Sequence, residues 1–412
     1  MTSPAKASRV QRVAGLAVLV AALGYFVDIY DLILFGIVRV KSLESLGVAE
    51  AQRMTTGLHL LNVQMIGLLI GGVMWGVIAD KRGRLSVLFA SIITYSVANI
   101  ANGFVHTLGQ YEVARFVAGI GLAGELGAGI TLVSELMTRE RRGWGTTLVA
   151  SVGIVGGVVA GLVGGAVHWR TAYFIGGGLG IALLALRIGV VESGMFDQTR
   201  GRDGVRRGDF FHLFRTWRRA LRYVAVIVVG MPIWYVVGIL MTLAPELGKA
   251  LGVTPVPTAG NALLFCYAGL AVGDLAAGVT SQLLRSRKRA IGIFMTMTIG
   301  ALAFYFTQRG GSSRTFYVGC SLCGFATGYW AVFLASAAEQ FGTNLRGTVA
   351  TTAPNFVRGA VPLMTLAYKA LAPGSGLVNA AIIVGIVVMA VAAAALVALP
   401  ETFGRDLDFV EE

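Results

Sequence analysis

Long apolar runs separated by short polar loops fill this chain from residue 13 to residue 399. Each run has about 20 residues, the length that an α-helix needs to cross a hydrocarbon core about 30 Å thick. The pattern predicts twelve membrane-spanning helices in two sets of six. The first set is expected at residues 13–38, 57–79, 86–105, 110–137, 145–167 and 170–191. The second set is expected at residues 221–245, 258–283, 289–308, 314–338, 347–372 and 376–399.

The longest polar stretch lies between the two sets and is rich in arginine. Its arginines are Arg200, Arg202, Arg206, Arg207, Arg215, Arg218, Arg219 and Arg222. So many charges do not cross a bilayer, and the stretch therefore separates two bodies of six helices. We expect an all-α polytopic membrane protein with an N-terminal half at residues 1–191, a basic linker at residues 192–220 and a C-terminal half at residues 221–412.

Positive charge is concentrated on one side of the predicted spans. That side receives the basic start of the chain, the loops at residues 81–84, 139–142 and 285–289, and the linker. Because short cytoplasmic loops carry the excess of Lys and Arg, both ends of the chain are expected on the cytoplasmic side of the plasma membrane. The apolar run after the polar start is too long for a cleaved signal sequence, so we expect a cytoplasmic tail there.

The composition agrees with this architecture, since 56% of the residues are hydrophobic and 13% are charged, whereas a soluble domain carries roughly 25% charged residues. The formal net charge of +13 does not indicate nucleic acid, because the cations lie in loops between apolar runs. We expect the partners to be a small substrate, protons and the lipid bilayer, and the chain to be a monomer.

Other chemistries find little support in the sequence. Cys320 and Cys323 have C-x-x-C spacing, but no histidine cluster accompanies them, so small buried residues are favoured over a metal or redox site. No G-x-x-x-x-G-K-[ST] motif is present to cradle phosphates, which leaves ATP-driven transport unsupported. We expect no cofactor, no metal and no enzymatic activity.

An internal repeat indicates that the two halves are related. Glu135 precedes Arg142 by seven residues, and Glu339 precedes Arg346 by the same interval, 204 residues further along the chain. We expect each pair to contribute to a charge network that gates the cytoplasmic face. We therefore expect two related six-helix halves.

The loop after the second predicted span carries a motif. It reads Gly76-Val77-Ile78-Ala79-Asp80-Lys81-Arg82-Gly83-Arg84, in which the cations hold the loop on one side of the membrane. The motif resembles the signature loop of the major facilitator superfamily of transporters. The resemblance implies alternating access between two six-helix halves. We expect Gly76, Asp80 and Arg84 to act in gating, with Asp80 near the positive end of the eleventh helix.

Three carboxylates fall inside predicted spans, where ionisable groups usually line a cavity or pair with one another. Asp28 and Asp31 are three residues apart and share a helix face. They are candidates for proton coupling or gating, and the alternative is structural pairing with an arginine. Glu125 lies in a fourth-span sequence that is similar to proton-coupled phosphate transporters, aromatic-acid symporters and organic-ion carriers. The resemblance implies a proton acceptor at Glu125, and the alternative is a hydrogen bond that packs the helix.

Two arginines inside spans are candidates for binding an anion. Arg358 lies twelve residues beyond Arg346, about 18 Å along a helix and near the middle of the bilayer. Its planar guanidinium suits a carboxylate or a phosphate, and organic-anion carriers and phosphate symporters resemble this pattern. Arg115 is a candidate for attracting the substrate or for holding its helix in place. The alternative for Arg358 is a permanent salt bridge to Asp28, Glu125 or Asp274.

Further polar and aromatic side chains are expected around the substrate. Asn355 lies three residues before Arg358, shares its helix face and can donate to an oxyanion. The candidates for the walls of the cavity are Trp234, Tyr235, Tyr329 and Trp330, with a lipid-facing position as the alternative.

These features favour a proton-coupled symporter of a small organic anion, with a carboxylate preferred over inorganic phosphate. In this interpretation Arg358 holds the anion, and Glu125 with Asp28 carries the proton. A second hypothesis is a proton-coupled antiporter that exports drugs or organic cations. A third is a substrate sensor without transport.

Overall fold

The computed structural model describes residues 4–82, 84–127, 139–192 and 210–404 of the chain. These residues form helices joined by short turns, and the one β-type contact among them is an isolated bridge between Thr254 and Ser312. The helices of the N-terminal half are α1 (Pro4–Ser45), α2 (Glu50–Arg82), α3 (Arg84–Phe104), α4 (Leu108–Leu122), α6 (Arg139–Ala166) and α7 (Trp169–Glu192). Those of the C-terminal half are η2 (Phe210–Phe214), α8 (Trp217–Tyr235), η3 (Val236–Met241), α9 (Ala244–Ala250), α10 (Ala259–Leu283), α11 (Arg287–Phe306), α12 (Ser313–Ala326), α13 (Trp330–Glu339), α14 (Thr343–Gly359), α15 (Val361–Ser375) and α16 (Leu377–Ala398).

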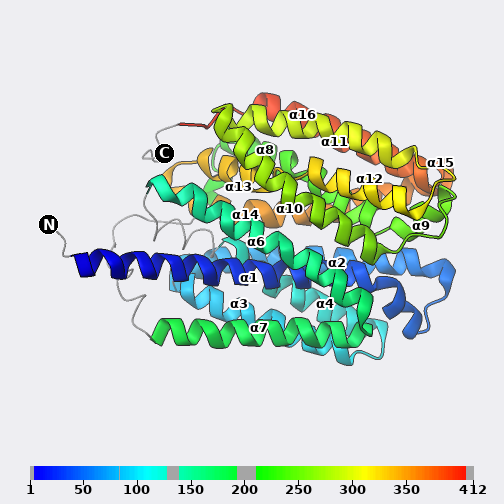
Figure 1. Ribbon diagram of the computed structural model, residues 1–412, viewed down its shortest axis with the longest axis horizontal. Coiled ribbons are helices and arrows are strands. Elements are labelled where there is room, and N and C mark those ends of the chain that lie inside the picture. The colour runs from blue at the N-terminus through cyan, green and yellow to red at the C-terminus, as the bar shows by residue number, and fades with distance from the viewer. Residues whose placement is uncertain (1–3, 83, 128–138, 193–209, 405–412) are drawn as a thin grey trace.

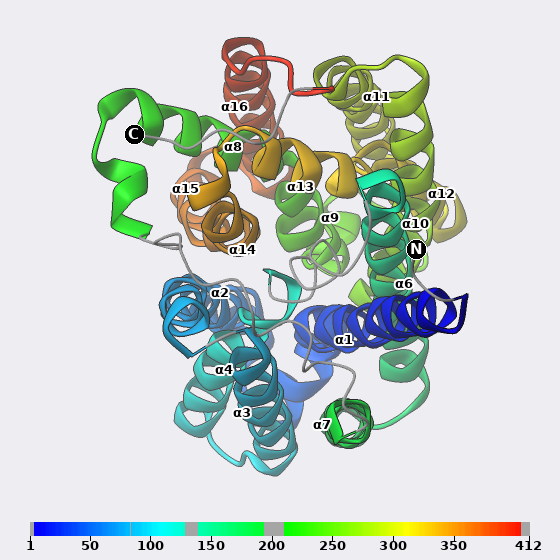
Figure 2. The ribbon, with the colours of Figure 1, turned by 90° about the vertical axis from the view of Figure 1, so that its left-hand side faces the viewer.

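The helices follow the long axis of the molecule and form two bundles side by side (Figure 1). One bundle holds α1, α2, α3, α4 and α7, the other holds α8 to α16, and α6 lies at the boundary beside α1 and α10 (Figure 2). The start of α1 and the end of α16 lie at the same end of the molecule, on the left in Figure 1. We call this the tail end, and we call the opposite end, where α9 and α15 lie, the far end.

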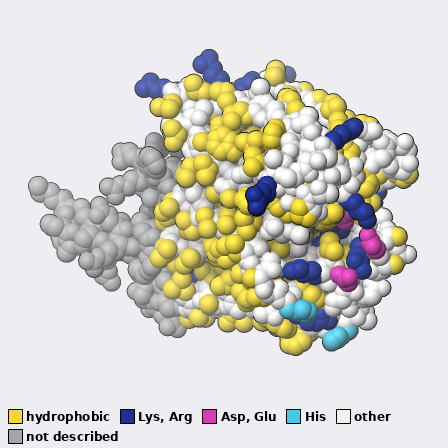
Figure 3. All heavy atoms as spheres, turned by 45° about the vertical axis from the view of Figure 1, so that its right-hand side comes forward, with side chains coloured by type: hydrophobic (Ala, Val, Ile, Leu, Met, Phe, Trp, Pro, Cys, Tyr) yellow, Lys and Arg dark blue, Asp and Glu magenta, His cyan; other side chains and the backbone are white. Residues whose placement is uncertain are grey.

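The surface and the helix lengths are those of a membrane protein. Ten helical segments of the described chain are long and apolar enough to cross a membrane. Large apolar side chains are exposed around the bundles, with Leu283 at 78% and Val397 at 74% exposure. Figure 3 shows apolar side chains over much of one face, while most of the charged ones gather toward the far end. Apolar surface of this extent is stable against lipid. The all-α polytopic architecture predicted from the sequence is confirmed.

Two of the twelve predicted spans are not among these ten segments, and each has its own reason. The fourth continues from α4 toward residues 128–138, which lie outside the described residues. The eleventh is divided at Ala360 into α14, with 17 residues, and α15, with 15 residues. Pro362 explains this division, because proline has no N–H to bond the carbonyl of Arg358 and its ring crowds that carbonyl.

Two further predicted spans are also interrupted. The seventh passes from α8 through the π-helix η3 and a turn at Leu243 into α9. The tenth is broken at residues 327–329, between α12 and α13. Both spans are still among the ten membrane-spanning segments, as Trp217–Met241 and Ser313–Glu339, but the sequence did not predict their breaks. The breaks have a consequence for function, because irregular backbone at membrane depth frees polar groups and is tolerated where it is buried in protein.

Candidate functional site

The first feature of the site is an ion pair that joins the two halves. Asp28 lies in α1 and Arg358 near the end of α14, and both side chains are 0% exposed. The Arg358 Nη2 atom lies 3.5 Å from the Asp28 Oδ2 atom. The Asp28 Oδ1 atom and the Arg358 Nε and Nη1 atoms have no hydrogen-bond partner among the described residues. The pair is therefore loose, with unused hydrogen-bonding capacity on both members, and it is closed to solvent in this conformation.

Aromatic side chains surround this pair from both halves. The Arg358 guanidinium lies over the Trp234 ring of α8, 5.6 Å from its centroid, a geometry in which cation–π attraction is favourable. One turn before Asp28, the Tyr25 hydroxyl accepts a hydrogen bond of 2.9 Å from Trp330 Nε1 across the boundary between the halves. Trp330 stacks on Phe333 with ring centroids 5.2 Å apart. The pair thus lies in an apolar setting that strengthens its electrostatic interactions.

Asn355 also joins the halves beside Arg358. Its Nδ2 atom donates to the Ala123 carbonyl at 2.9 Å and to the Thr351 carbonyl at 3.0 Å. Its Oδ1 atom has no partner among the described residues. Ala123 ends α4, just before the turn that leads to Glu125. Asn355 therefore connects the Arg358 helix to the segment that carries Glu125.

Tyr235 and Tyr329 hydrogen-bond inside the C-terminal half. The Tyr235 hydroxyl donates to the Ala381 carbonyl at 2.6 Å, and the Tyr329 hydroxyl donates to the Val229 carbonyl at 3.0 Å. Within the described chain, no hydrogen bond, ion pair or ring contact joins either tyrosine to Arg358. Of the four aromatics expected as cavity walls, the structure brings Trp234 to the arginine and Trp330 to Tyr25, one turn before Asp28.

A second buried ion pair lies inside the N-terminal half. Arg187 of α7 binds Glu125 with both terminal nitrogens; the Nη1 atom lies 3.1 Å from Oε2, and the Nη2 atom contacts Oε1. The two side chains are 5% and 1% exposed. Gly24 of α1 lies directly against this pair, and a Cβ there would overlap the Glu125 carboxylate and the Arg187 guanidinium.

Sequence reasoning missed Arg187. It is the only charged residue between Arg170 and Glu192. Because it lies near the end of a predicted span, it was expected to reach the membrane surface like other cations at span ends. The available signal was its distance from the polar linker, since four apolar or small residues separate Arg187 from Glu192, the last residue of α7. Glu125, expected as a proton acceptor, has this arginine as its partner.

A third buried group holds Arg115 and Asp31. The Arg115 Nη2 atom donates to Gln64 Oε1 of α2, and the guanidinium lies over the rings of Phe35 and Tyr173, at 5.0 and 5.9 Å from their centroids. The positive charge of Arg115 lies near enough to the Asp31 carboxyl for electrostatic attraction. Neither Asp31 oxygen has a hydrogen-bond partner among the described residues. Arg115 and Asp31 thus belong to the interior of the N-terminal half.

The far end is closed by contacts that the sequence did not predict. Arg39 of α1 is 0% exposed and binds both carboxylate oxygens of Glu246 in α9, at 2.7 and 2.8 Å. It also donates to the carbonyl of Thr242, the residue after the π-helix, at 3.1 Å. Thr365 donates to Asn62 at 2.8 Å in the same region. We call Arg39, Glu246 and Thr242 the far-end clasp, because it joins the two halves.

The expected gating residues are only partly described. Glu135 lies outside the described residues, and the side chains of Asp80, Arg84 and Arg142 are not described. Gly76 lies in α2 opposite Thr352 of α14. A Cβ added at Gly76 would lie 3.9 Å from the nearest Thr352 atom.

Glu339 takes a different partner from the expected Arg346. It pairs with Arg287 of α11 at 3.3 Å and accepts a hydrogen bond of 2.8 Å from Thr402. Arg346 donates to the Phe341 carbonyl at 3.5 Å. The repeat in the sequence therefore does not translate into a Glu339–Arg346 ion pair in this conformation.

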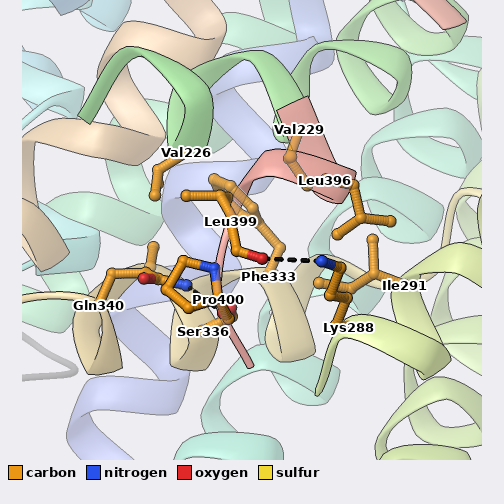
Figure 4. Close-up of a pocket in the computed structure, with 11 residues that line it drawn as sticks. Val226, Val229, Lys288, Ile291, Phe333, Ser336, Gln340, Leu396, Leu399 and Pro400 are labelled. Carbon is orange, nitrogen blue, oxygen red and sulfur yellow. Dashed lines mark hydrogen bonds between the residues drawn. The ribbon is translucent and has the colours of Figure 1, made fainter. Parts of the chain in front are cut away.

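The chain after α16 is fastened to the tail end of the C-terminal half. Lys288 donates to the Leu399 carbonyl and Gln340 to the Pro400 carbonyl, each at 2.9 Å, around a small pocket between α8, α11, α13 and α16 (Figure 4). Glu401 accepts from Ser286 Oγ and from the backbone N–H of Arg287. Partial burial raises the pKa of Glu401, but its hydrogen bonds outweigh this effect and lower the pKa to about 2.

The described residues hold no cluster of three His, Cys, Asp or Glu side chains that suits a metal ion. Cys266, Cys320 and Cys323 are buried free thiols. What the interior offers instead is a set of acids and arginines, of which one loose pair joins the halves.

Two helical bundles, a surface suited to lipid and charged groups buried at the boundary between the bundles define a polytopic membrane carrier. The chain belongs to the Major Facilitator Superfamily, whose family model matches residues 16–364.

Relatives and a solved structure agree with this assignment. The niacin transporter NiaP of Acinetobacter baylyi is 27% identical over 386 residues, which cover 85% of this chain and 87% of that protein. The 3-(3-hydroxy-phenyl)propionate transporter of Escherichia coli is 27% identical over 349 residues, covering 81% and 82% of the two chains. The proton:xylose symporter XylE has the same fold, with a TM-score of 0.70 at 16% identity over 97% of this chain and 98% of that one.

Proposed function

We propose that this transporter carries a small aromatic carboxylate together with a proton. The observation that carries the proposal is the loose Asp28–Arg358 pair, in which Arg358 Nε and Nη1 have no hydrogen-bond partner among the described residues. A guanidinium binds a carboxylate best through two parallel N–H groups, and the single 3.5 Å contact to Asp28 leaves that mode unused. A substrate carboxylate is able to provide it.

The surroundings of Arg358 favour an aromatic substrate. Trp234 and Trp330 supply flat apolar surfaces beside the pair. The named substrates of the relatives, niacin and 3-(3-hydroxy-phenyl)propionate, are aromatic acids. Stacking of a substrate ring on these side chains would add selectivity over inorganic phosphate, which has no apolar part.

A proton is needed because the substrate replaces Asp28 as the partner of Arg358. An ionised Asp28 without its arginine would be an uncompensated buried charge, which costs several kcal/mol. A proton on Asp28 removes that cost. Binding of one monovalent anion is thereby linked to uptake of one proton.

Alternating access requires that one end of the boundary closes while the other opens. In this conformation the far-end clasp and the Thr365–Asn62 hydrogen bond hold the far end together. With both ends of the chain on the cytoplasmic side, as the distribution of cations predicts, the far end faces the outside. Uptake from outside then requires the clasp to open.

Nicotinate uptake into proteoliposomes tests the proposal. An inward proton gradient is expected to drive accumulation. Arg358→Ala is expected to reduce uptake about 30-fold or more, since truncating one member of a buried charge pair costs about 2–5 kcal/mol. Thr296→Val is the matched control, because Thr296 is exposed on α11 and bonds only to the Gly292 carbonyl of its own helix.

Two outcomes would overturn the proposal. If organic cations are exchanged for protons and Arg358→Ala leaves that exchange intact, the protein is an antiporter of cations. If Arg358→Ala retains nicotinate uptake at the level of Thr296→Val, the anion binds elsewhere.

A further inference from the structure

The described part of the C-terminal half contains one buried acid that has no arginine beside it. Asp274 lies in α10 and is 0% exposed. Three buried acids are described in the N-terminal half. Asp28 and Glu125 form ion pairs with Arg358 and Arg187, and Asp31 lies within the electrostatic influence of Arg115 without an ion-pair contact. No lysine or arginine of the described chain lies within ion-pair distance of Asp274.

Asp274 is hydrogen-bonded to the start of α13, the second part of the broken tenth span. Its Oδ1 atom accepts a hydrogen bond of 2.7 Å from the backbone N–H of Ala331, in the first turn of α13. The backbone of Gly328, in the break of the tenth span, packs directly on the backbone of Gly273 and Asp274. The positive end of the helix dipole of α13 therefore points at this carboxyl.

The second oxygen of Asp274 is unused. The Oδ2 atom is buried and has no hydrogen-bond donor among the described residues. The titratable group that faces the carboxyl is the Tyr25 hydroxyl of α1, and the Ala331 N–H is the group that faces it from α13. An ionised carboxylate with one neutral hydrogen bond and no cation is costly to bury, whereas a protonated one is not.

Asp274 is connected to the substrate region through α13. Trp330, the first residue of that helix, donates to Tyr25, and Tyr25 is one turn from Asp28 on α1. A change of charge at Asp274 thus acts on the first turn of α13. The first residue of that helix, Trp330, bridges the halves beside Arg358.

We propose that Asp274 is a second proton-binding residue of the transport cycle, distinct from the acid that exchanges with the substrate. It holds a proton on Oδ2 while Trp330 bridges the halves, and it releases that proton when the bridge opens and water reaches the carboxyl. This inference rests on the proposed function, because it assumes that one proton already neutralises the substrate anion. A second proton makes each cycle carry one net positive charge.

Net charge movement is measurable without changing Asp28, the residue that carries the first proton. In proteoliposomes with a potassium diffusion potential, negative inside, wild-type accumulation of nicotinate is expected to rise by up to about 50-fold per 100 mV, since one charge in that field corresponds to about 2.3 kcal/mol. Asp274→Asn keeps an oxygen for the Ala331 N–H but carries no ionisable proton. It is expected to retain uptake driven by a pH gradient and to lose the response to voltage.

The controls separate this inference from the proposed function. Thr296→Val is expected to respond to voltage like the wild type. Exchange of labelled for unlabelled nicotinate, which needs no driving force, verifies that Asp274→Asn is folded and functional. If the wild-type protein does not transport nicotinate under a pH gradient, the proposed function fails. If it does so but its accumulation ignores voltage, or if Asp274→Asn keeps the full voltage response, the assignment of Asp274 is overturned.

Discussion

Two of the arginine–carboxylate pairs in the described chain are almost fully buried on both sides, Arg187–Glu125 and Arg358–Asp28, and they differ in almost every other respect. Arg187 and Glu125 belong to the same half and make two nitrogen–oxygen contacts. Arg358 and Asp28 belong to different halves and make one contact of 3.5 Å. The first pair uses both carboxylate oxygens and leaves one polar atom, Arg187 Nε, without a partner among the described residues, whereas the second leaves three.

The difference indicates that the two pairs have different roles. A pair with two contacts inside one bundle has both carboxylate oxygens occupied and little to gain from a substrate, and removing one member is strongly unfavourable. A loose pair that spans two moving bodies has spare hydrogen-bonding capacity and is broken whenever the bodies separate. We therefore interpret Arg187–Glu125 as part of the scaffold of the N-terminal half and Arg358–Asp28 as the pair that exchanges partners during transport.

The largest expected effect is on the scaffold pair. Arg187→Ala leaves Glu125 buried without its cation and is expected to destabilise the folded protein by about 3–5 kcal/mol. Thermal unfolding in detergent measures the loss. The double variant Arg187→Met with Glu125→Leu removes both charges at similar volume and is expected to recover most of the stability.

A different result would invert the comparison. If Arg187→Ala is as stable as the wild type, and Glu125→Gln abolishes proton-driven uptake while sparing nicotinate exchange, then Glu125 is the proton acceptor predicted from its sequence context. The structural assignment of that pair would then be wrong.

A smaller effect is expected at the pair between the halves. Asp28→Asn removes the anion that competes with the substrate for Arg358, so nicotinate is expected to bind about 10-fold more tightly, equivalent to about 1.4 kcal/mol. The same variant has no proton to exchange at this position and is expected to lose the part of the pH-driven accumulation that the Asp28 proton supplies, which leaves only the part coupled through Asp274. Isothermal titration in detergent measures the first change and proteoliposome uptake the second. Weaker nicotinate binding by Asp28→Asn would mean that Asp28 contacts the substrate and does not compete with it.

The sequence pointed to both members of the pair between the halves, and it offered their contact only as one of three alternatives for Arg358. Asp28 and Arg358 stand out because each is an ionisable residue inside an apolar run, a property that can be read locally. Their contact joins residues 330 positions apart and depends on how two helices are rotated about their axes, which no local pattern fixes. For this reason Asp28 remained one of three alternatives for the arginine.

The missed residues share a physical cause. Arg187 and Arg39 lie near the ends of apolar runs, where a cation usually reaches the membrane surface. In the structure both are buried by acids from other segments, Glu125 and Glu246. The breaks in the spans were missed in a similar way. A π-helix and a three-residue interruption leave the hydrophobic pattern intact, although they change which backbone groups are free.

A carboxylate outside the membrane offers the smallest and most controlled test. Glu401 accepts hydrogen bonds from Ser286 and from backbone N–H groups, and its pKa is lowered from 4.5 to about 2. Because the folded-state pKa lies below the unfolded value, its stabilising contribution is fully present above about pH 4.5 and is lost as the pH falls toward 2. Glu401→Gln is therefore expected to lower the unfolding temperature by the same few degrees at every pH from 5 to 8, for a loss of about 1 kcal/mol. A difference that grows between pH 8 and pH 5 would show that another group titrates with this network. Glu401, whose hydrogen-bond donors are in place, would then no longer serve as an example of a well-satisfied carboxylate with which the loosely paired Asp28 can be compared.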